Sequence, residues 1–329
     1  MVNKDSSILI TGASGFLGTY VSDWLIAAGY ENVHTAGGIK EDLDLTNPAT
    51  VGWLLDWSKP ECIIHLASKN SGLKNNAEYP AGIMYENFIM SLNLFEEARQ
   101  YPVKKFIFAG DICCYPDNTP SPFRETDLWR GSAPASKRFY AHSKRTLMEF
   151  NAAMSHQYGD WCGINLIFSD IYGIGDKWNP LYGKTIPTAI TNIAAAKKEG
   201  RDLEILGSTR TERDFINVAD AANAIVLCVE KQNEPTTFNV SNGKSVKIRD
   251  VHDLIAKASG YEKEIIWHPS KIEKPLQRSL NISKIKKELG WSPIVDFESS
   301  LVDLVEWHDN NLEISYVPED TLALTHPSS

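Results

Sequence analysis

The chain has 329 residues, with 33 Lys and Arg against 42 Asp and Glu, which gives a formal net charge of −9. That charge argues against a general nucleic-acid binder, although a local basic pocket stays possible. A hydrophobic fraction of 43% and an aromatic fraction of 10% exclude collagen, a coiled coil or a disordered chain. At roughly 150 residues per domain, the length allows two domains or one large α/β unit with an appendage.

Targeting and cysteine signals are sparse. We expect no membrane association, because no apolar run approaches the roughly 18 residues that cross a bilayer and the first seven residues lack the apolar core of a signal peptide. The cysteines are odd in number and lack CxxC spacing, so we expect reduced thiols, no disulfide framework and no metal site. These features predict a cytoplasmic protein. The cysteines are Cys62, Cys113, Cys114, Cys162 and Cys228.

The first half of the chain alternates short apolar runs with helical patterns. Strands are expected at residues 7–11, 31–35, 62–67, 105–109 and 163–169, and helices at residues 19–28, after Pro48, and near residues 81–100 and 139–158. This order predicts an α/β fold built on a doubly wound parallel Rossmann sheet, with helices on both faces.

The regular alternation of strands and helices ends after Gly173. A loop rich in Gly, Pro and Trp is followed by a helix and a strand at residues 203–206. We therefore expect a smaller C-terminal α/β domain. The chain is expected to enter and leave this domain more than once. The expected division is residues 1–173 plus about 214–240 for the larger domain, residues 174–213 plus about 241–311 for the smaller one, and residues 312–329 for a tail.

A glycine turn joins the first strand to the first helix. Its GxxGxxG spacing lets backbone N–H groups approach a pyrophosphate at a helix N-terminus. A tight structural turn is the plain alternative, but the position after the first strand of a βαβ pattern favours dinucleotide binding. The candidate cofactor contacts in this turn are Gly12, Ser14, Gly15, Phe16, Leu17 and Gly18.

The residues after the second strand bear on the choice of cofactor. An acidic side chain there would hold the ribose 2′-hydroxyl of NAD, and none precedes Lys40. Lys40 could instead face a 2′-phosphate, which favours NADP, whereas Asp44 and the acids just before it keep NAD open.

Tyr140 and Lys144 form a YxxxK pattern, one turn apart on a predicted helix, where the ammonium can lower the phenol pKa and hold the cofactor ribose. Together with the glycine turn, the His65-Leu66-Ala67 run and residues 213–220, this pattern resembles the extended short-chain dehydrogenase/reductases, the NAD-dependent epimerase/dehydratase family. The resemblance covers residues 7 to about 308. It implies an NAD(P)-dependent enzyme whose larger domain binds the dinucleotide and whose smaller domain binds a nucleotide-sugar.

Within that family the chain is similar to GDP-L-fucose synthases at residues 71–76, 79–81, 85–87 and 113–116. Residues 83–99 are also similar to GDP-mannose 3,5-epimerases. The resemblance implies an epimerase, or an epimerase/reductase, that acts on a GDP-linked 4-keto sugar in glycan precursor synthesis. A redox-neutral 3,5-epimerase with tightly bound NAD and a non-catalytic nucleotide-sugar or dinucleotide binder are the alternatives.

The resemblance also implies catalytic roles. Tyr140 would donate a proton to, or accept one from, a sugar hydroxyl, and Lys144 would adjust the pKa of Tyr140. Cys113 and Lys184 would be the acid/base pair of epimerisation, which needs one group on each face of the sugar. Cys113 matches the cysteine of the fucose synthases, whereas Lys184 stands where they have His and the 3,5-epimerases have Lys. A small buried hydrophobe and a loop charge are the plain alternatives for these two residues.

Asp111 departs from the family pattern. It stands where the family has a Ser or Thr that donates a hydrogen bond to the reacting sugar oxygen. A carboxylate there would raise the pKa of Tyr140 and handicap reduction, unless it is protonated or paired with a cation. A lost active site, or a shift in register that brings in another hydroxyl, is the alternative.

The remaining implied contacts are Asp44, Leu45, Ala67 and Asn87 for the cofactor, and Asn179, Lys184, Arg213 and Arg278 for the substrate. The two arginines suit a diphosphate, because the planar guanidinium donates two parallel hydrogen bonds. The long helices near residues 81–100 and 139–158 resemble those that pair in homodimers of this family.

Overall fold

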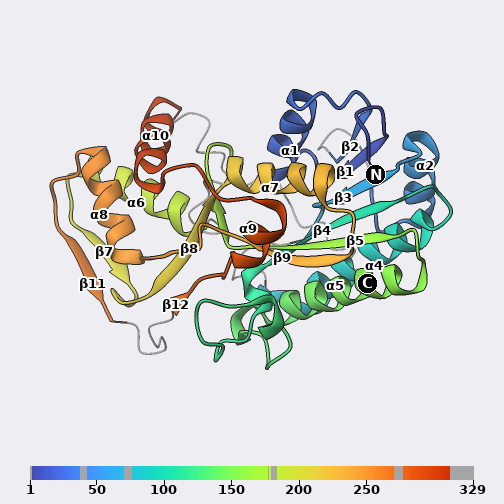
Figure 1. Ribbon diagram of the computed structural model, residues 1–329. Coiled ribbons are helices and arrows are strands. Elements are labelled where there is room, and N and C mark those ends of the chain that lie inside the picture. Colours follow the sequence, from blue (N-terminus) through green and yellow to red (C-terminus); the bar gives the residue numbers. More distant parts are fainter. Residues whose placement is uncertain are drawn as a thin grey trace, which may run out of the picture.

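The computed structural model describes residues 2–37, 43–69, 76–176, 178, 184–269 and 277–311. Lys40, Asn179, the expected tail and most of residues 71–76 therefore lie outside the described residues. Figure 1 shows two parts, a larger one on the right around a parallel sheet and a smaller one on the left.

The larger part is built on a six-stranded sheet in which every neighbouring pair is parallel. Its order is β2 (Val33–Ala36), β1 (Ile8–Thr11), β3 (Cys62–His65), β4 (Lys105–Asp111), β5 (Cys162–Phe168) and β9 (Thr236–Val240). The predicted doubly wound parallel sheet is confirmed.

Helices cover both faces of this sheet. On one face lie α1 (Phe16–Ala27) and α7 (Val218–Lys231), and on the other α2 (Pro48–Ser58), α4 (Pro80–Ala98) and α5 (Arg138–Gln157). Successive strand residues point to opposite faces, so Ile8 and Ile10 pack toward α1 and α7 while Leu9 packs toward α2 and α4. Figure 1 shows α7 above the sheet and α5 below it.

Local signals explain several element ends. The side chain of Asn47 accepts the N–H of Ala49 at 3.0 Å and caps α2, which begins at Pro48. The first helix begins at Phe16 rather than at the expected residue 19, because Gly15 itself is the extended residue that opens it. β4 runs on to Asp111, two residues beyond the expected end, since its pairing with β5 continues to Phe168.

Among the residues that the structure describes, the smaller part contains two short sheets and three helices. One sheet joins β6 (Asp170–Tyr172), β10 (Ser245–Lys247) and β12 (Gln277–Arg278) to β8 (Glu212–Asn217), and the other pairs β7 (Leu203–Leu206) with β11 (Ile265–His268). α6 (Thr185–Glu199), α8 (Ile248–Ser259) and α10 (Phe297–Asn310) share one hydrophobic core with these strands.

Two segments differ from the expected division. β6 was expected in the larger part but pairs with β8 outside the six-stranded sheet, and β8 contributes to both cores, with Ile216 in that of the larger part and Phe215 in that of the smaller one. α9 (Ser283–Leu289) was expected in the smaller part but packs on α7 and β9, because Ile285 and Leu289 are buried in the core of the larger part. In the described ranges no helix is long and apolar enough to cross a membrane.

Candidate active site

The glycine turn packs directly onto the end of β3. Gly12 has φ +72, and a Cβ there would lie 2.6 Å from the backbone nitrogen of Ala67; a Cβ on Gly18 would collide with the carbonyl oxygen of Gly12. Glycine is therefore required for this approach. The turn lies between β1 and β3, where the strand order reverses, and no side chain caps the first turn of α1. These features fit a dinucleotide pyrophosphate.

A buried polar chain supports the turn from below. The hydroxyl of Thr11 lies 2.6 Å from Nδ1 of His65, and Nε2 of His65 lies 2.9 Å from the hydroxyl of Ser91 on α4. Burial, with a smaller contribution from Lys144, lowers the pKa of His65 to about 3. His65 is thus a neutral hydrogen-bonding link between β1, β3 and α4.

Asn87 fixes the segment that follows β3. Its Nδ2 donates to the carbonyl of Lys69 at 2.9 Å, and its Oδ1 accepts the N–H of Lys69 at 3.1 Å and the hydroxyl of Ser68 at 3.0 Å. This segment therefore borders the region outside the carboxyl ends of the strands, where open α/β sheets bind their ligands and which we call the crevice.

Asp44 and Leu45 lie beyond β2, before α2. Oδ1 of Asp44 accepts the backbone N–H and the hydroxyl of Thr46 at 2.9 and 2.7 Å, and buried Leu45 receives a hydrogen bond on its carbonyl from Asn93 at 3.1 Å. Both residues form an ordered connection into α2.

Tyr140 and Lys144 are buried on the sheet side of α5, at 4% and 2% exposure. Burial, followed by Asp111 and Cys113, raises the pKa of Tyr140 well above 10, while hydrogen bonding from Ser68 acts in the opposite direction. Burial lowers the pKa of Lys144 to about 8, and its Nζ lies 4.7 Å from the centre of the Phe108 ring. The phenol is therefore protonated at neutral pH.

Asp111 ends β4 and begins a short 3-10 turn, η1 (Ile112–Cys114), where its Oδ1 accepts the N–H of Cys113 at 2.7 Å. Burial alone would raise the pKa of Asp111, but Lys137 and the hydrogen bond from Cys113 outweigh burial and hold that pKa below its ordinary value. Asp111 in turn raises the pKa of Lys137 to about 12. Of the alternatives that the sequence left open, an ionised carboxylate influenced by a cation agrees with the lowered pKa.

Cys113 lies in a small buried cluster with Tyr140. Burial, then Cys114 and Asp111, raises the pKa of the Cys113 thiol well above 9, so the thiol is protonated in the free protein. The neighbouring Cys114 directs its thiol toward the carbonyl of Ala141 at 3.8 Å and belongs to the core.

Lys184 lies at the start of α6, where it is the N-cap residue. Its Nζ is 3.3 Å from Oδ1 of Asp176, donates to the carbonyl of Ile171 at 3.1 Å and lies 4.9 Å from the centre of the Phe16 ring. The amine is therefore held beside the glycine turn and makes no direct contact with Cys113.

The two candidate arginines differ in their surroundings. Arg213 on β8 is half-buried, with Nη1 3.8 Å from Oδ2 of Asp170. Arg278 is buried and fully engaged, since Nη1 donates to Asp117 at 2.6 Å and Nη2 donates to the carbonyls of Ile112 and Tyr115 at 2.9 and 3.3 Å. Arg278 thus fastens the turn that carries Cys113.

Residues 8–241 match the model of the NAD dependent epimerase/dehydratase family. The chain belongs to this family. The resemblance drawn from the sequence is therefore confirmed.

Relatives cover nearly the whole chain. GDP-L-fucose synthase 1 of Arabidopsis thaliana is 27% identical over 95% of this chain and 96% of that protein, and GDP-L-colitose synthase of Yersinia pseudotuberculosis is 27% identical over 89% and 95%. A solved GDP-L-fucose synthetase from Naegleria fowleri bound to NADP has a TM-score of 0.86 at 22% identity and covers 95% of each chain.

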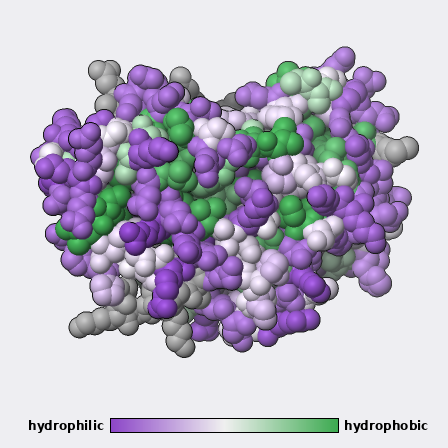
Figure 2. Space-filling view, turned by 60° about the vertical axis from the view of Figure 1, so that its left-hand side comes forward, coloured by the Kyte–Doolittle hydropathy of each residue, from purple (hydrophilic) through white to green (hydrophobic). Residues whose placement is uncertain are grey.

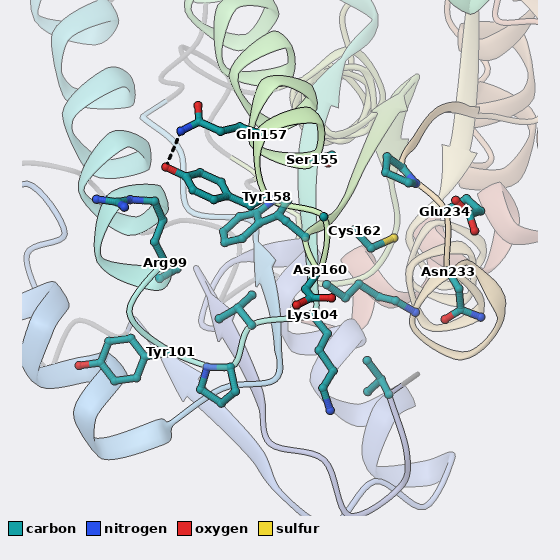
Figure 3. Close-up of a pocket in the computed structure, with 18 residues that line it drawn as sticks. Arg99, Tyr101, Lys104, Ser155, Gln157, Tyr158, Asp160, Cys162, Asn233 and Glu234 are labelled. Atoms are coloured by element: carbon teal, nitrogen blue, oxygen red, sulfur yellow. Dashed lines mark hydrogen bonds between the residues drawn. The ribbon is translucent and has the colours of Figure 1, made fainter.

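A cavity of about 1120 Å³ lies away from this family site (Figure 3). It lies at the amino ends of β4 and β5, opposite Asp111, where Lys105 and Cys162 begin the two strands. Its wall includes Lys104, which is paired with Glu61 at 2.7 Å. Within the described ranges no three His, Cys, Asp or Glu side chains are grouped to hold a metal ion.

Two residues of the family site were not expected from the sequence. Ser68 follows the His65-Leu66-Ala67 run directly, and Lys137 precedes Tyr140 by one helical turn. Either position could have been found by examining the neighbours of the matched motifs for polar side chains, since the carboxyl end of β3 and the start of α5 both border the crevice.

Proposed function

We propose that this protein is an NADP-dependent epimerase/reductase acting on a GDP-linked 4-keto sugar in glycan precursor synthesis. The observation that carries the proposal is the buried cluster of Tyr140 and Cys113, with Lys144, at the carboxyl edge of a sheet whose glycine turn fits a dinucleotide. Relatives named GDP-L-fucose synthase and GDP-L-colitose synthase, which match almost end to end, support the GDP-linked substrate.

The cofactor contacts are proposed from the turn and the strand ends. Gly12, Gly15 and Gly18 would leave room for the pyrophosphate, with the N–H groups at the start of α1 donating to it. Lys144 would hold the ribose. The lack of an acidic side chain between β2 and Lys40 supports NADP over NAD. A bound nicotinamide supplies hydride to the sugar carbonyl.

The side chains of this chain would move the protons. The phenol of Tyr140 has a raised pKa, so it donates a proton to the sugar oxygen, and Lys144 stabilises the phenolate that forms. Cys113 belongs to η1 and Lys184 to the start of α6, so the two groups come from different elements, and we infer that a sugar ring bound between them would meet one group on each face. That placement suits removal and return of a carbon-bound proton.

Arg213 and Lys184 are proposed to contact the diphosphate or sugar from the smaller part, since both are half-exposed beside the crevice. Asn179 remains proposed from the sequence alone. Arg278 is proposed to act indirectly, because its guanidinium is already engaged by the Cys113 turn.

Exposed aromatic side chains on neighbouring helices support a homodimer. Tyr85 on α4 is 65% exposed, Phe139 and Phe150 are exposed on α5, and the two helices pack side by side. We propose that they form the dimer interface. Five buried cysteines, none in a disulfide, support a cytoplasmic location.

The test is to mix the protein with NADPH and GDP-4-keto-6-deoxymannose and to follow the absorbance of the reduced nicotinamide, with the UDP-linked analogue as the control. We expect one NADPH to be oxidised for each GDP-sugar reduced. Epimerised product without loss of NADPH would identify the redox-neutral alternative, and binding of GDP-sugar without turnover would identify a non-catalytic binder.

A further inference from the structure

Asp176 is a buried carboxylate beside the amine of Lys184. It follows β6, and its side chain is 2% exposed, whereas that of Lys184 is 48% exposed. Oδ1 of Asp176 lies 3.3 Å from Nζ of Lys184. The N–H of Asp176 donates to the carbonyl of Gly173 at 3.3 Å, so a turn of the backbone fixes the carboxylate. A buried acid in a fixed position therefore faces a half-exposed amine.

Two further contacts hold the same amine. Nζ of Lys184 donates to the carbonyl of Ile171 at 3.1 Å and lies 4.9 Å from the centre of the Phe16 ring. Ile171 belongs to β6, and Phe16 is the first residue of α1. A lysine side chain with no such partners samples many rotamers. The carboxylate, the carbonyl and the ring, from separate segments, thus restrict the amine to one place.

The loop that carries Asp176 is itself packed on the first turns of α1. The hydroxyl of Tyr20 donates to the carbonyl of Ile174 at 3.1 Å, and a Cβ on Gly175 would lie 3.8 Å from the ring of Phe16. These contacts set the position of the loop relative to the glycine turn. The Lys184 amine, held by that loop, therefore has a defined position relative to the proposed dinucleotide site.

The proposed epimerisation depends on such placement. When a base takes the proton from the carbon next to the ketone, the electron pair of the C–H bond passes to the carbonyl oxygen. An acid on the other face then gives a proton to the same carbon as the electrons return. Both groups afterwards exchange protons with water, so atoms and charge balance. A group that is misplaced by about 1 Å slows a step of this kind about 100-fold.

We propose that Asp176 is a positioning residue, which holds the Lys184 amine where it exchanges a proton with the carbon next to the sugar ketone. This inference rests on the proposed function. Asp176 acts through Lys184 and not on the sugar itself. Its buried location suits this role, because a carboxylate in a fixed position holds its partner more firmly than one on a flexible surface side chain.

The experiment converts GDP-4-keto-6-deoxymannose in D2O with each full-length variant and follows inversion next to the ketone by NMR. Asp176→Asn should lower kcat for inversion about 10- to 100-fold, because it removes the charge that holds the amine, and KM should change less than about twofold. Asp176→Glu, which keeps a carboxylate, should lose less. A titration of NADPH fluorescence reports that each variant has folded.

Asp127→Asn is the matched control. Asp127 is also a buried carboxylate, with a side chain 9% exposed, and its Oδ1 lies 3.1 Å from Nη1 of Arg130. Neither residue belongs to the proposed site. The control variant should therefore invert the sugar at the wild-type rate.

The double variant Asp176→Asn with Lys184→Met separates positioning from a purely structural role. If Asp176 acts through Lys184, the double variant inverts the sugar as slowly as Lys184→Met, within about threefold, since no amine is left to hold. Deuterium should also enter on the same face in Asp176→Asn as in Lys184→Met, which a general loss of stability would not produce. A further loss of about tenfold in the double variant would contradict the proposal.

The remaining outcomes distinguish this inference from the proposed function. A wild-type rate of inversion in Asp176→Asn would overturn the inference alone. So would a large rise in the dissociation constant for GDP without a loss of inversion at saturating substrate, since the pair would then serve diphosphate binding. If the wild-type protein binds GDP and NADPH but neither inverts nor reduces a GDP-linked ketone, the proposed function fails and this inference with it.

Discussion

The surroundings of Tyr140 keep its phenol protonated. Removing the phenol hydroxyl should therefore lower the rate of turnover while leaving the affinity for the cofactor unchanged. Tyr140→Phe should lower turnover about 100-fold or more, because the phenol moves the proton, while the glycine turn and Lys144 still bind NADPH. Steady-state rates and a titration of NADPH fluorescence measure the two effects. Tyr85→Phe, on an exposed tyrosine, is the control, and an unchanged rate in Tyr140→Phe would refute the assignment.

Cys113 and Lys184 should each be needed for inversion at the carbon next to the ketone. We expect Cys113→Ser and Lys184→Met to stop inversion, whereas exchange on one face survives in the variant that keeps its base. The stereochemistry of the product, read by NMR, checks this. Cys162→Ser is the control, since Cys162 lies at the opposite end of the sheet. Native inversion in both variants would mean that the pair is misassigned.

His65 should make the fold sensitive to acid. Its pKa of about 3 lies below the ordinary 6.5, so the neutral form is favoured by folding. The stabilisation is complete above pH 6.5 and is lost as the pH falls toward 3, because only the unfolded chain takes up the proton. Wild type should lose about 1 kcal/mol more per pH unit than His65→Gln in that window, by urea unfolding. Parallel pH profiles would contradict the buried neutral state.

Most of the proposed site residues could be predicted from local sequence motifs. The others depend on contacts between segments that are distant in the sequence. Tyr140, Lys144 and the glycines stand in spacings that local geometry requires. The engagement of Arg278 with the Cys113 turn depends on a strand 161 residues beyond Asp117, so no local pattern contains it.

At the scale of elements, Lys105 ties the start of β4 to the end of α7. Its Nζ donates to the carbonyls of Cys228 and Val229 at 3.0 and 2.6 Å, at the negative end of the helix dipole. Lys105→Met should lower the free energy of unfolding by about 2 to 4 kcal/mol, because buried carbonyls lose their donor.

Urea unfolding measures this loss, and the adjacent Lys104→Met is the matched control. Lys104 is half-exposed and paired with Glu61, so its replacement should cost about 0 to 1 kcal/mol. Equal costs at the two positions would show that the buried contacts of Lys105 add nothing to the stability of the fold.

Long apolar or periodic segments were predictable, whereas short ones were not. The strands of the large sheet are buried on both faces, so they appear in the sequence as continuous apolar runs such as residues 62–65. β6 and β12 have three and two residues, too few to show a period, and only their pairing with β8 defines them. α9 has seven residues, and its location depends on the buried Ile285 and Leu289.

At the scale of the whole molecule, the outer sides of α4 and α5 are expected to meet a second copy. Figure 2 shows one face on which hydrophobic patches are interrupted by hydrophilic residues. Tyr85→Asp should convert a dimer to a monomer in light scattering at micromolar concentration, since it buries a charge in the proposed interface. Trp53→Asp, at an exposed aromatic residue on α2, should leave the mass unchanged. A monomeric wild type would exclude the interface.

The chain passes between its two parts through very short connections. Ser169 alone separates β5 from β6, and α7 follows β8 with no residue between them. Because the smaller part is assembled from separate stretches of sequence, it cannot be cut out or exchanged with that of a relative as one fragment. Changing the substrate preference by exchanging the smaller part would therefore require several segments to be replaced at once. Point substitutions around the crevice are the simpler route for evolution and for engineering.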